Sequence, residues 1–81
     1  MAYYWMSFCD PHAPKGEQFL GVAIVEAADE ASAVLVSGLH GCNPGGEIGI
    51  LEILPEQCPV SIAAVKNKLH SRADLERLGL I

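Results

Sequence analysis

Residues 19–26 read FLGVAIVE, and they contain the longest apolar run in the chain, the seven residues from Phe19 to Val25. The apolar residues follow one another without the alternation of a half-exposed strand, which is typical of a central strand covered on both faces. Seven residues are far fewer than the roughly 20 that a membrane-spanning helix needs. The run therefore predicts the central strand of a small sheet.

An aromatic-rich stretch before this run, YYWMSFC at Tyr3–Cys9, predicts a first strand. The segment Asp10–Gly16 between them contains two prolines and a glycine, as loops do. We expect the two strands to form a hairpin with a long loop. The aromatic side chains are expected either in a core or interface, or as a surface on which a ring stacks.

A helix is predicted after the second strand. Asp29 can cap its first turn, with Ser32 three residues later, and the helix should end at about Leu39 or His40. Gly41 suits the left-handed position that follows a helix end. The predicted buried stripe consists of Ala31, Val34, Leu35 and Leu39.

The rest of the chain predicts one more strand and short helices. EIGILEIL at Glu47–Leu54 predicts the third strand. Pro59 can begin a short helix through Val65 and Leu69. Ser71 can cap a last helix, Arg72–Leu78, with Asp74 completing an approximate capping box and Gly79 closing it.

These elements predict one α+β domain over residues 1–81. Its expected form is a small two-layer β-β-α-β domain with a three-stranded, mainly antiparallel sheet, one main helix and short C-terminal helices. A chain of this size buries only about 60–65% of its unfolded surface, so its core is thin. The helix can cover one face of the sheet, which would leave the face carrying Trp5 bare. We therefore expect a homo-oligomer joined through that face or through a sheet edge.

Charge is unevenly distributed along the chain. Residues 1–65 carry a net charge of −7 and residues 66–81 carry +2, which together give −5. This balance disfavours binding to polymeric nucleic acid, which needs clustered Lys and Arg. The C-terminal segment is the one region where several bases could attract a small anion, although the same bases would also suit a solvated helix face.

Three cysteines, Cys9, Cys42 and Cys58, make an odd number without the spacing of a disulfide framework. The N-terminus has no signal-peptide pattern. Together these features lead us to expect a cytoplasmic protein with reduced thiols and no membrane partner.

Catalytic and metal patterns are weak. Cys9 with His12, and His40 with Cys42, could supply four zinc ligands, but neither pair has the C-x2-C spacing of structural zinc sites. The alternative is half-buried thiols and loop histidines, and we expect no metal and no cofactor. No sequence pattern indicates a cysteine activated by a neighbouring base, and none indicates a pair of carboxylates that act as general acid and base. The sequence therefore predicts a protein that is not an enzyme.

The loop NPGGE at Asn43–Glu47 is the most distinctive motif. Paired glycines allow positive φ angles and can present successive N–H groups to an anion. The alternative is a tight turn in which geometry alone requires the glycines, just as Lys15 could simply be a solubilising loop residue. The ligand-binding residues we expect are Trp5, Lys15, Gln18, Asn43, Gly45, Gly46, Glu47, Lys68 and Arg72.

The blocks YWMSFCDP, PKGEQFLG, GCNPGGE and NKLHSRADL cover much of the chain. With them the sequence resembles a family of very short phage, prophage and bacterial proteins of unknown function that carry QFLG and NPGGE motifs. By weaker analogy it is similar to viral sponges, small oligomeric proteins that sequester nucleotide-derived immune signals. The analogy implies a non-enzymatic, anti-defence protein of the host cytoplasm that binds a cyclic nucleotide or an ADP-ribose-type ligand. The alternative is a protein-interaction module that docks a host or phage protein through its apolar sheet face.

Overall fold

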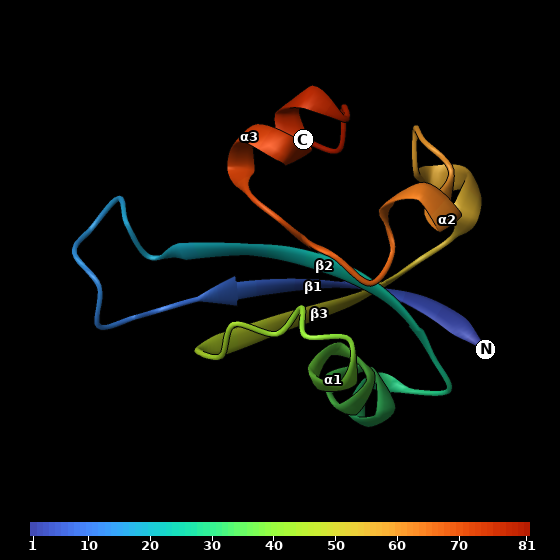
Figure 1. Cartoon of the computed structure of the whole chain (residues 1–81), viewed down its shortest axis with the longest axis horizontal. Helices are drawn as coiled ribbons and strands as arrows, with labels where there is room; N and C mark the ends of the chain where they lie inside the picture. The colour runs from blue at the N-terminus through green and yellow to red at the C-terminus, as the bar shows by residue number, and fades with distance from the viewer.

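The computed structural model describes residues 1–81 as an antiparallel four-stranded sheet with helices on both faces (Figure 1). The strands lie in the order β3-β1-β2-β4. Helix α1 lies on one side of the sheet, and α2 and α3 lie on the other. The elements are β1 (Ala2–Cys9), β2 (Phe19–Ala27), α1 (Glu30–Leu39), β3 (Glu47–Ile53), a 3-10 turn η1 (Pro55–Gln57), α2 (Ile62–Val65), β4 (Leu69–His70) and α3 (Arg72–Arg77).

The predicted hairpin of β1 and β2 is confirmed. The two strands pair antiparallel along their whole length, with Trp5 opposite Ile24 at the centre. The register shifts at the end of β1, where Phe8 lies opposite Gly21 but Cys9 lies opposite Phe19. Gly21 has a φ of +139° at this bulge, a value that side-chain-bearing residues rarely adopt.

Helix α1 begins and ends almost where the sequence predicts, but it buries a different face. The Asp29 carboxylate accepts a 2.7 Å hydrogen bond from the Ser32 N–H, which confirms the predicted cap. The buried residues are Ala33 and Ser37. Their small side chains let the helix lie close against β2. Of the predicted stripe, Val34 is half-buried against the core, whereas the placement of Leu35 and Leu39 is wrong, because they are 71% and 86% exposed. Ala31 is exposed too.

The core on the α1 side is built from alternate residues of the central strands. The side chains of Tyr4, Met6 and Phe8 from β1 contact those of Ala23 and Val25 from β2. This period of two follows from the pleat of the strands. It places Trp5 and the other alternate residues on the opposite face.

The sheet has four strands, so the predicted three-stranded sheet is incomplete. Leu69 and His70 pair with Ala23 and Val22 on the free side of β2. Gly21 permits this approach, since a Cβ there would lie 2.8 Å from the His70 carbonyl oxygen. A two-residue strand is too short to show a periodic pattern in the sequence.

The short helix predicted from Pro59 through Leu69 is present only in part, because α2 spans Ile62–Val65. Asn67 has a φ of +63° two residues after α2, and its N–H donates a 2.8 Å hydrogen bond to the Ile24 carbonyl oxygen. This turn brings the chain back to the sheet and allows β4 to form. The capping box of α3 is confirmed, since Ser71 and Asp74 each accept a hydrogen bond from the backbone N–H of the other at 3.2 Å.

The C-terminal third of the chain covers the second face of the sheet. Ile62 and Val65 of α2 are buried against Ile24, and the half-buried Trp5 and Leu78 pack around them. The expected bare face is therefore absent, and the domain has three layers rather than two (Figure 1). The self-association that we inferred from a bare face loses that support.

No helix of the structure combines the length and the apolar character that crossing a membrane requires.

Candidate functional site

The largest hollow in the protein lies between α2, β4 and α3. We call it the C-terminal groove; its volume is about 410 Å³. Its polar lining consists of Lys68, His70, Asp74 and Arg77, and its apolar lining includes Val60 and Leu78. Two of the five bases of an acidic chain therefore border one concave surface.

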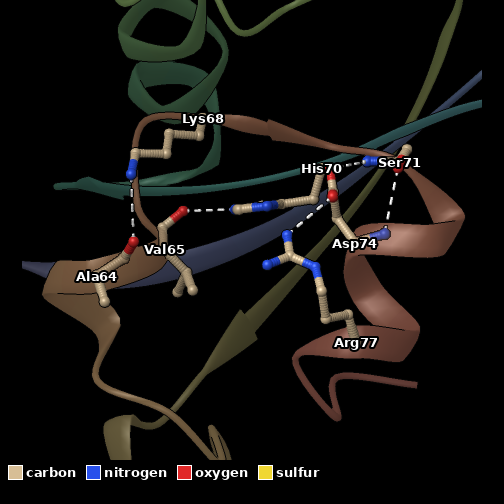
Figure 2. A network of polar contacts seen from close by, with 7 residues as sticks. All are labelled: Ala64, Val65, Lys68, His70, Ser71, Asp74 and Arg77. Carbon is tan, nitrogen blue, oxygen red and sulfur yellow. Dashed lines mark hydrogen bonds and ion pairs between the residues drawn. The ribbon is translucent and has the colours of Figure 1, made fainter.

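His70 lines the groove and is 6% exposed. Its Nε2 lies 2.7 Å from the carbonyl oxygen of Val65 (Figure 2). A carbonyl oxygen can only accept, so Nε2 must carry the proton of this hydrogen bond. The bond ties β4 to the end of α2 and holds the two walls of the groove together.

The two bases of the groove are held loosely. Lys68 Nζ donates a 3.4 Å hydrogen bond to the Ala64 carbonyl oxygen, and Arg77 Nη2 donates a 3.0 Å bond to Asp74 Oδ1 (Figure 2). The Arg77 side chain is 70% exposed, so the ion pair contributes little to stability. Both cations keep further donors that an incoming anion can use.

Asp74 serves the helix as well as the groove. Hydrogen bonds from the Ser71 backbone, and then from the Arg77 side chain, hold the pKa of its carboxyl below the ordinary value. The ionised carboxylate orients Arg77 along the rim of the groove.

Trp5 and Arg72 border a second, smaller hollow of about 220 Å³ on the same sheet face. The guanidinium carbon of Arg72 lies 5.4 Å from the centre of the Phe19 ring, in cation–π range. Trp5 also borders a third hollow of about 110 Å³ beside Leu80. The structure thus brings Trp5 and Arg72 together, and places Lys68 in the neighbouring C-terminal groove.

The two loops expected to form a site lie at the same end of the sheet, because Cys9 is opposite both Phe19 and Glu47. Neither loop borders any of the three hollows. Lys15 and Glu47 are exposed there. The Gln18 side chain donates a 3.2 Å hydrogen bond to the Ala13 carbonyl oxygen within its own loop.

The NPGGE loop is organised by hydrogen bonds within the protein. Asn43 accepts a 2.8 Å bond from the Gly45 N–H and donates a 3.2 Å bond to Ser37 Oγ. Gly45 and Gly46 have φ angles of +88° and +79°, as their pairing predicts. A Cβ on Gly46 would overlap the Cys9 carbonyl oxygen. These contacts are those of a tight turn, which was the alternative considered for this loop.

The cysteines are three free thiols. Burial raises the pKa of the Cys42 thiol, and its sulfur donates to the Ser37 carbonyl oxygen at 3.5 Å. A thiol with a raised pKa is a poor nucleophile at neutral pH. No three side chains of the His, Cys, Asp and Glu types gather in a metal-binding arrangement.

The sequence reasoning missed His70, Asp74 and Arg77 as members of one site. The segregation of four bases into residues 66–81 pointed to the region. The turn at Asn67 that folds these residues around a groove leaves no comparable pattern in the sequence.

Comparisons of the chain with family models, with curated proteins and with solved structures found no match. The resemblance to short phage proteins therefore stays a prediction.

Proposed function

We propose that this protein binds a small anionic, nucleotide-like ligand in the C-terminal groove and releases it chemically unchanged. The observation that carries the proposal is the presence of Lys68 and Arg77 on the border of one groove of about 410 Å³. Ligand sites typically measure about 300–1,000 Å³, so the groove suits a ligand of mononucleotide size.

Electrostatics supports an anion at this place. The +2 charge of residues 66–81 is opposed by −7 over the rest of the chain, so an anion is attracted to the C-terminal segment and repelled elsewhere. The phosphate would receive hydrogen bonds from Lys68 and from the Arg77 donors that Asp74 does not use. Val60 and Leu78 would contact the apolar part of the ligand.

The test is a panel of ligands measured by thermal shift. The panel contains inorganic phosphate, AMP, a cyclic dinucleotide and ADP-ribose, because the analogy with sponges implies sequestration of such signals. A ligand at a hundredfold excess over its Kd stabilises the folded state by about 2.7 kcal/mol, which for a domain of this size raises the melting midpoint by on the order of 10 °C. Recovery of the intact ligand by mass spectrometry is expected, since the proposal includes no reaction.

Charge-matched variants locate the site. Lys68→Ala and Arg77→Ala should each weaken binding by roughly 10- to 100-fold, the effect of losing one hydrogen bond to a charged group. Lys66→Ala removes the same charge from a residue that borders no hollow, and should leave the affinity nearly unchanged. Lys15→Ala tests the loop site instead. If only Lys15→Ala weakens binding, or if no ligand shifts the midpoint, the groove is not the site.

A second candidate function is that of a protein-interaction module, which the exposed Leu35 and Leu39 on the outward face of α1 favour. The apolar sheet face expected to serve this purpose is covered by the C-terminal segment. This function predicts no thermal shift with any ligand, and loss of a captured partner in the variant Leu35→Lys but not in Lys68→Ala.

A further inference from the structure

The two edges of the sheet differ. One edge is β4, which has only two residues, and the other is β3, which has seven and pairs with β1 alone. The sequence of β3, EIGILEI, contains no proline and no lysine, and its pairing with β1 runs without a bulge. Short strands, charged side chains, proline and bulges are the usual ways in which an edge is protected from pairing. Of these protections, the β3 edge has only the charges of Glu47 and Glu52.

We propose that β3 pairs antiparallel with β3 of a second copy of this chain, about a two-fold axis at Ile50, so that two four-stranded sheets form one continuous sheet. Helix α1 makes its main contacts with β2, two strands in from this edge, and β3 has no neighbouring strand on its outer side. The proposal concerns the β3 edge and is independent of the C-terminal groove.

The register follows from the pattern of faces. Because β1 and β3 are directly paired, Ile48, Ile50 and Glu52 share the α1 face with Met6 and its alternate neighbours. In a continuous sheet, residues opposite one another point to the same face, so these residues must face each other across the axis. Centring the pair on Ile50 satisfies this and pairs all seven residues. A slip by two residues leaves two residues of each strand unpaired.

The same register matches side-chain sizes. Leu51 is 64% exposed in the single chain and would lie opposite Gly49 of the second copy. Gly49 has no side chain, although the Ser7 hydroxyl lies 2.8 Å from where its Cβ would be, so the leucine would cover the Gly49 backbone beside Ser7. Two such contacts, related by the axis, would remove both exposed leucines from water.

Charge selects the antiparallel arrangement. Glu52 would lie opposite Ile48, and Glu47 opposite Ile53, so no two carboxylates face each other. The nearest carboxylates of the two copies, Glu52 and Glu47 of the second copy, would be one residue apart along the strand and on opposite faces of the sheet, while the two copies of Glu52 would be four residues apart, on the order of 14 Å. Parallel pairing in register would place each glutamate beside its own copy, and like charges directly opposite are destabilising.

The first experiment measures mass in solution. Sedimentation equilibrium of the wild-type chain should give twice the monomer mass of 8.6 kDa at micromolar concentrations, and the dimer should tighten as salt screens two copies that each carry −5. Leu51→Lys should weaken dimerisation at least tenfold. Leu35→Lys makes the same change at a 71% exposed residue of α1, away from the edge, and should have no effect.

The second experiment tests the register. In the proposed pair, Ile50 and its copy are directly opposite, at a separation that a disulfide can span, whereas the two copies of Glu52 are too far apart. Ile50→Cys should therefore form a covalent dimer on mild oxidation and Glu52→Cys should not, with mass spectrometry identifying the linked peptide because three native thiols are present. The proposal is overturned if the wild-type chain keeps a mass of 8.6 kDa at several hundred micromolar. In that case the β3 edge would be available to pair with an extended segment of another protein. Equal cross-linking of the two variants, or equal loss of the dimer in Leu51→Lys and Leu35→Lys, would also overturn it.

Discussion

Gly46 lies where the chain enters β3, and its backbone is pressed against the carbonyl group of Cys9. Gly45, the residue before it, has a similar φ angle but nothing within 4 Å of the place where a Cβ would be. A side chain at Gly45 would therefore cost only the strain of a left-handed backbone. A side chain at Gly46 would cost that strain and would also clash with Cys9.

We expect Gly45→Ala to lower the free energy of unfolding by about 1–2 kcal/mol, the cost of the left-handed conformation for an alanine. Gly46→Ala should cost clearly more, about 3 kcal/mol or above, because its methyl group must also displace the end of β1. Urea unfolding of both variants measures the difference. Equal destabilisation by the two substitutions would mean that the end of β1 at Cys9 moves aside without a measurable loss of free energy of unfolding.

Helix α1 shows how the ends of an element can be predicted while its buried face is not. The Asp29–Ser32 hydrogen bond is a local interaction that the spacing of the two residues indicates. The face is chosen by fit against β2, where Ala33 and Ser37 allow a closer approach than leucines would. The Ser37 hydroxyl is satisfied within the helix by the Val34 carbonyl oxygen at 2.7 Å, so its burial is permitted.

The cap of α1 predicts an acid-sensitive stability. The hydrogen bond from the Ser32 backbone lowers the pKa of Asp29 in the folded chain below its ordinary value. A lowered folded pKa contributes stability above the unfolded pKa of about 3.9, and this contribution is lost as pH falls through the folded pKa. The melting midpoint should therefore decrease below about pH 4. Asp29→Asn keeps a capping oxygen that does not titrate, so its midpoint should fall less over the same range.

Thermal melts between about pH 5 and pH 2.5 compare the two proteins across that window. The pKa of Asp74 is also lowered, so the melting midpoint of the Asp29→Asn variant should still fall in part as the pH decreases. If the midpoints of wild type and Asp29→Asn fall in parallel, the cap of α1 does not contribute to acid sensitivity.

For the molecule as a whole, the C-terminal segment acts as the second cover of the sheet. Leu75 of α3 is 1% exposed and borders the hollow that Trp5 also lines. Leu75→Ala should lower the free energy of unfolding by about 2–4 kcal/mol and the melting midpoint by on the order of 10 °C.

The chain has one tryptophan, so its fluorescence reports on this cover. In Leu75→Ala the emission of Trp5 should shift to longer wavelength in the folded state, because water gains access beneath α3. Leu39→Ala removes the same atoms from an 86% exposed residue and should change neither the midpoint nor the emission. An unshifted emission in folded Leu75→Ala would show that α3 does not shield Trp5.

The parts of this protein that the sequence predicts are those whose causes are local. The apolar run of residues 19–25, the Asp29 cap, the Ser71–Asp74 box and the positive φ angles of Gly41, Gly45 and Gly46 each depend on neighbouring residues. Steric freedom and hydrogen-bond spacing act over a few residues, so a short stretch of sequence is enough to predict them.

The cover of the second face, the fourth strand, the buried side of α1 and the C-terminal groove all required the folded chain. Each depends on how segments distant in sequence fill a shared volume. One turn at Asn67 brings β4 to the edge of β2, and with it His70 to Val65 and Lys68 toward Arg77. Such packing is decided by the shapes of both partners, and neither segment alone carries that information.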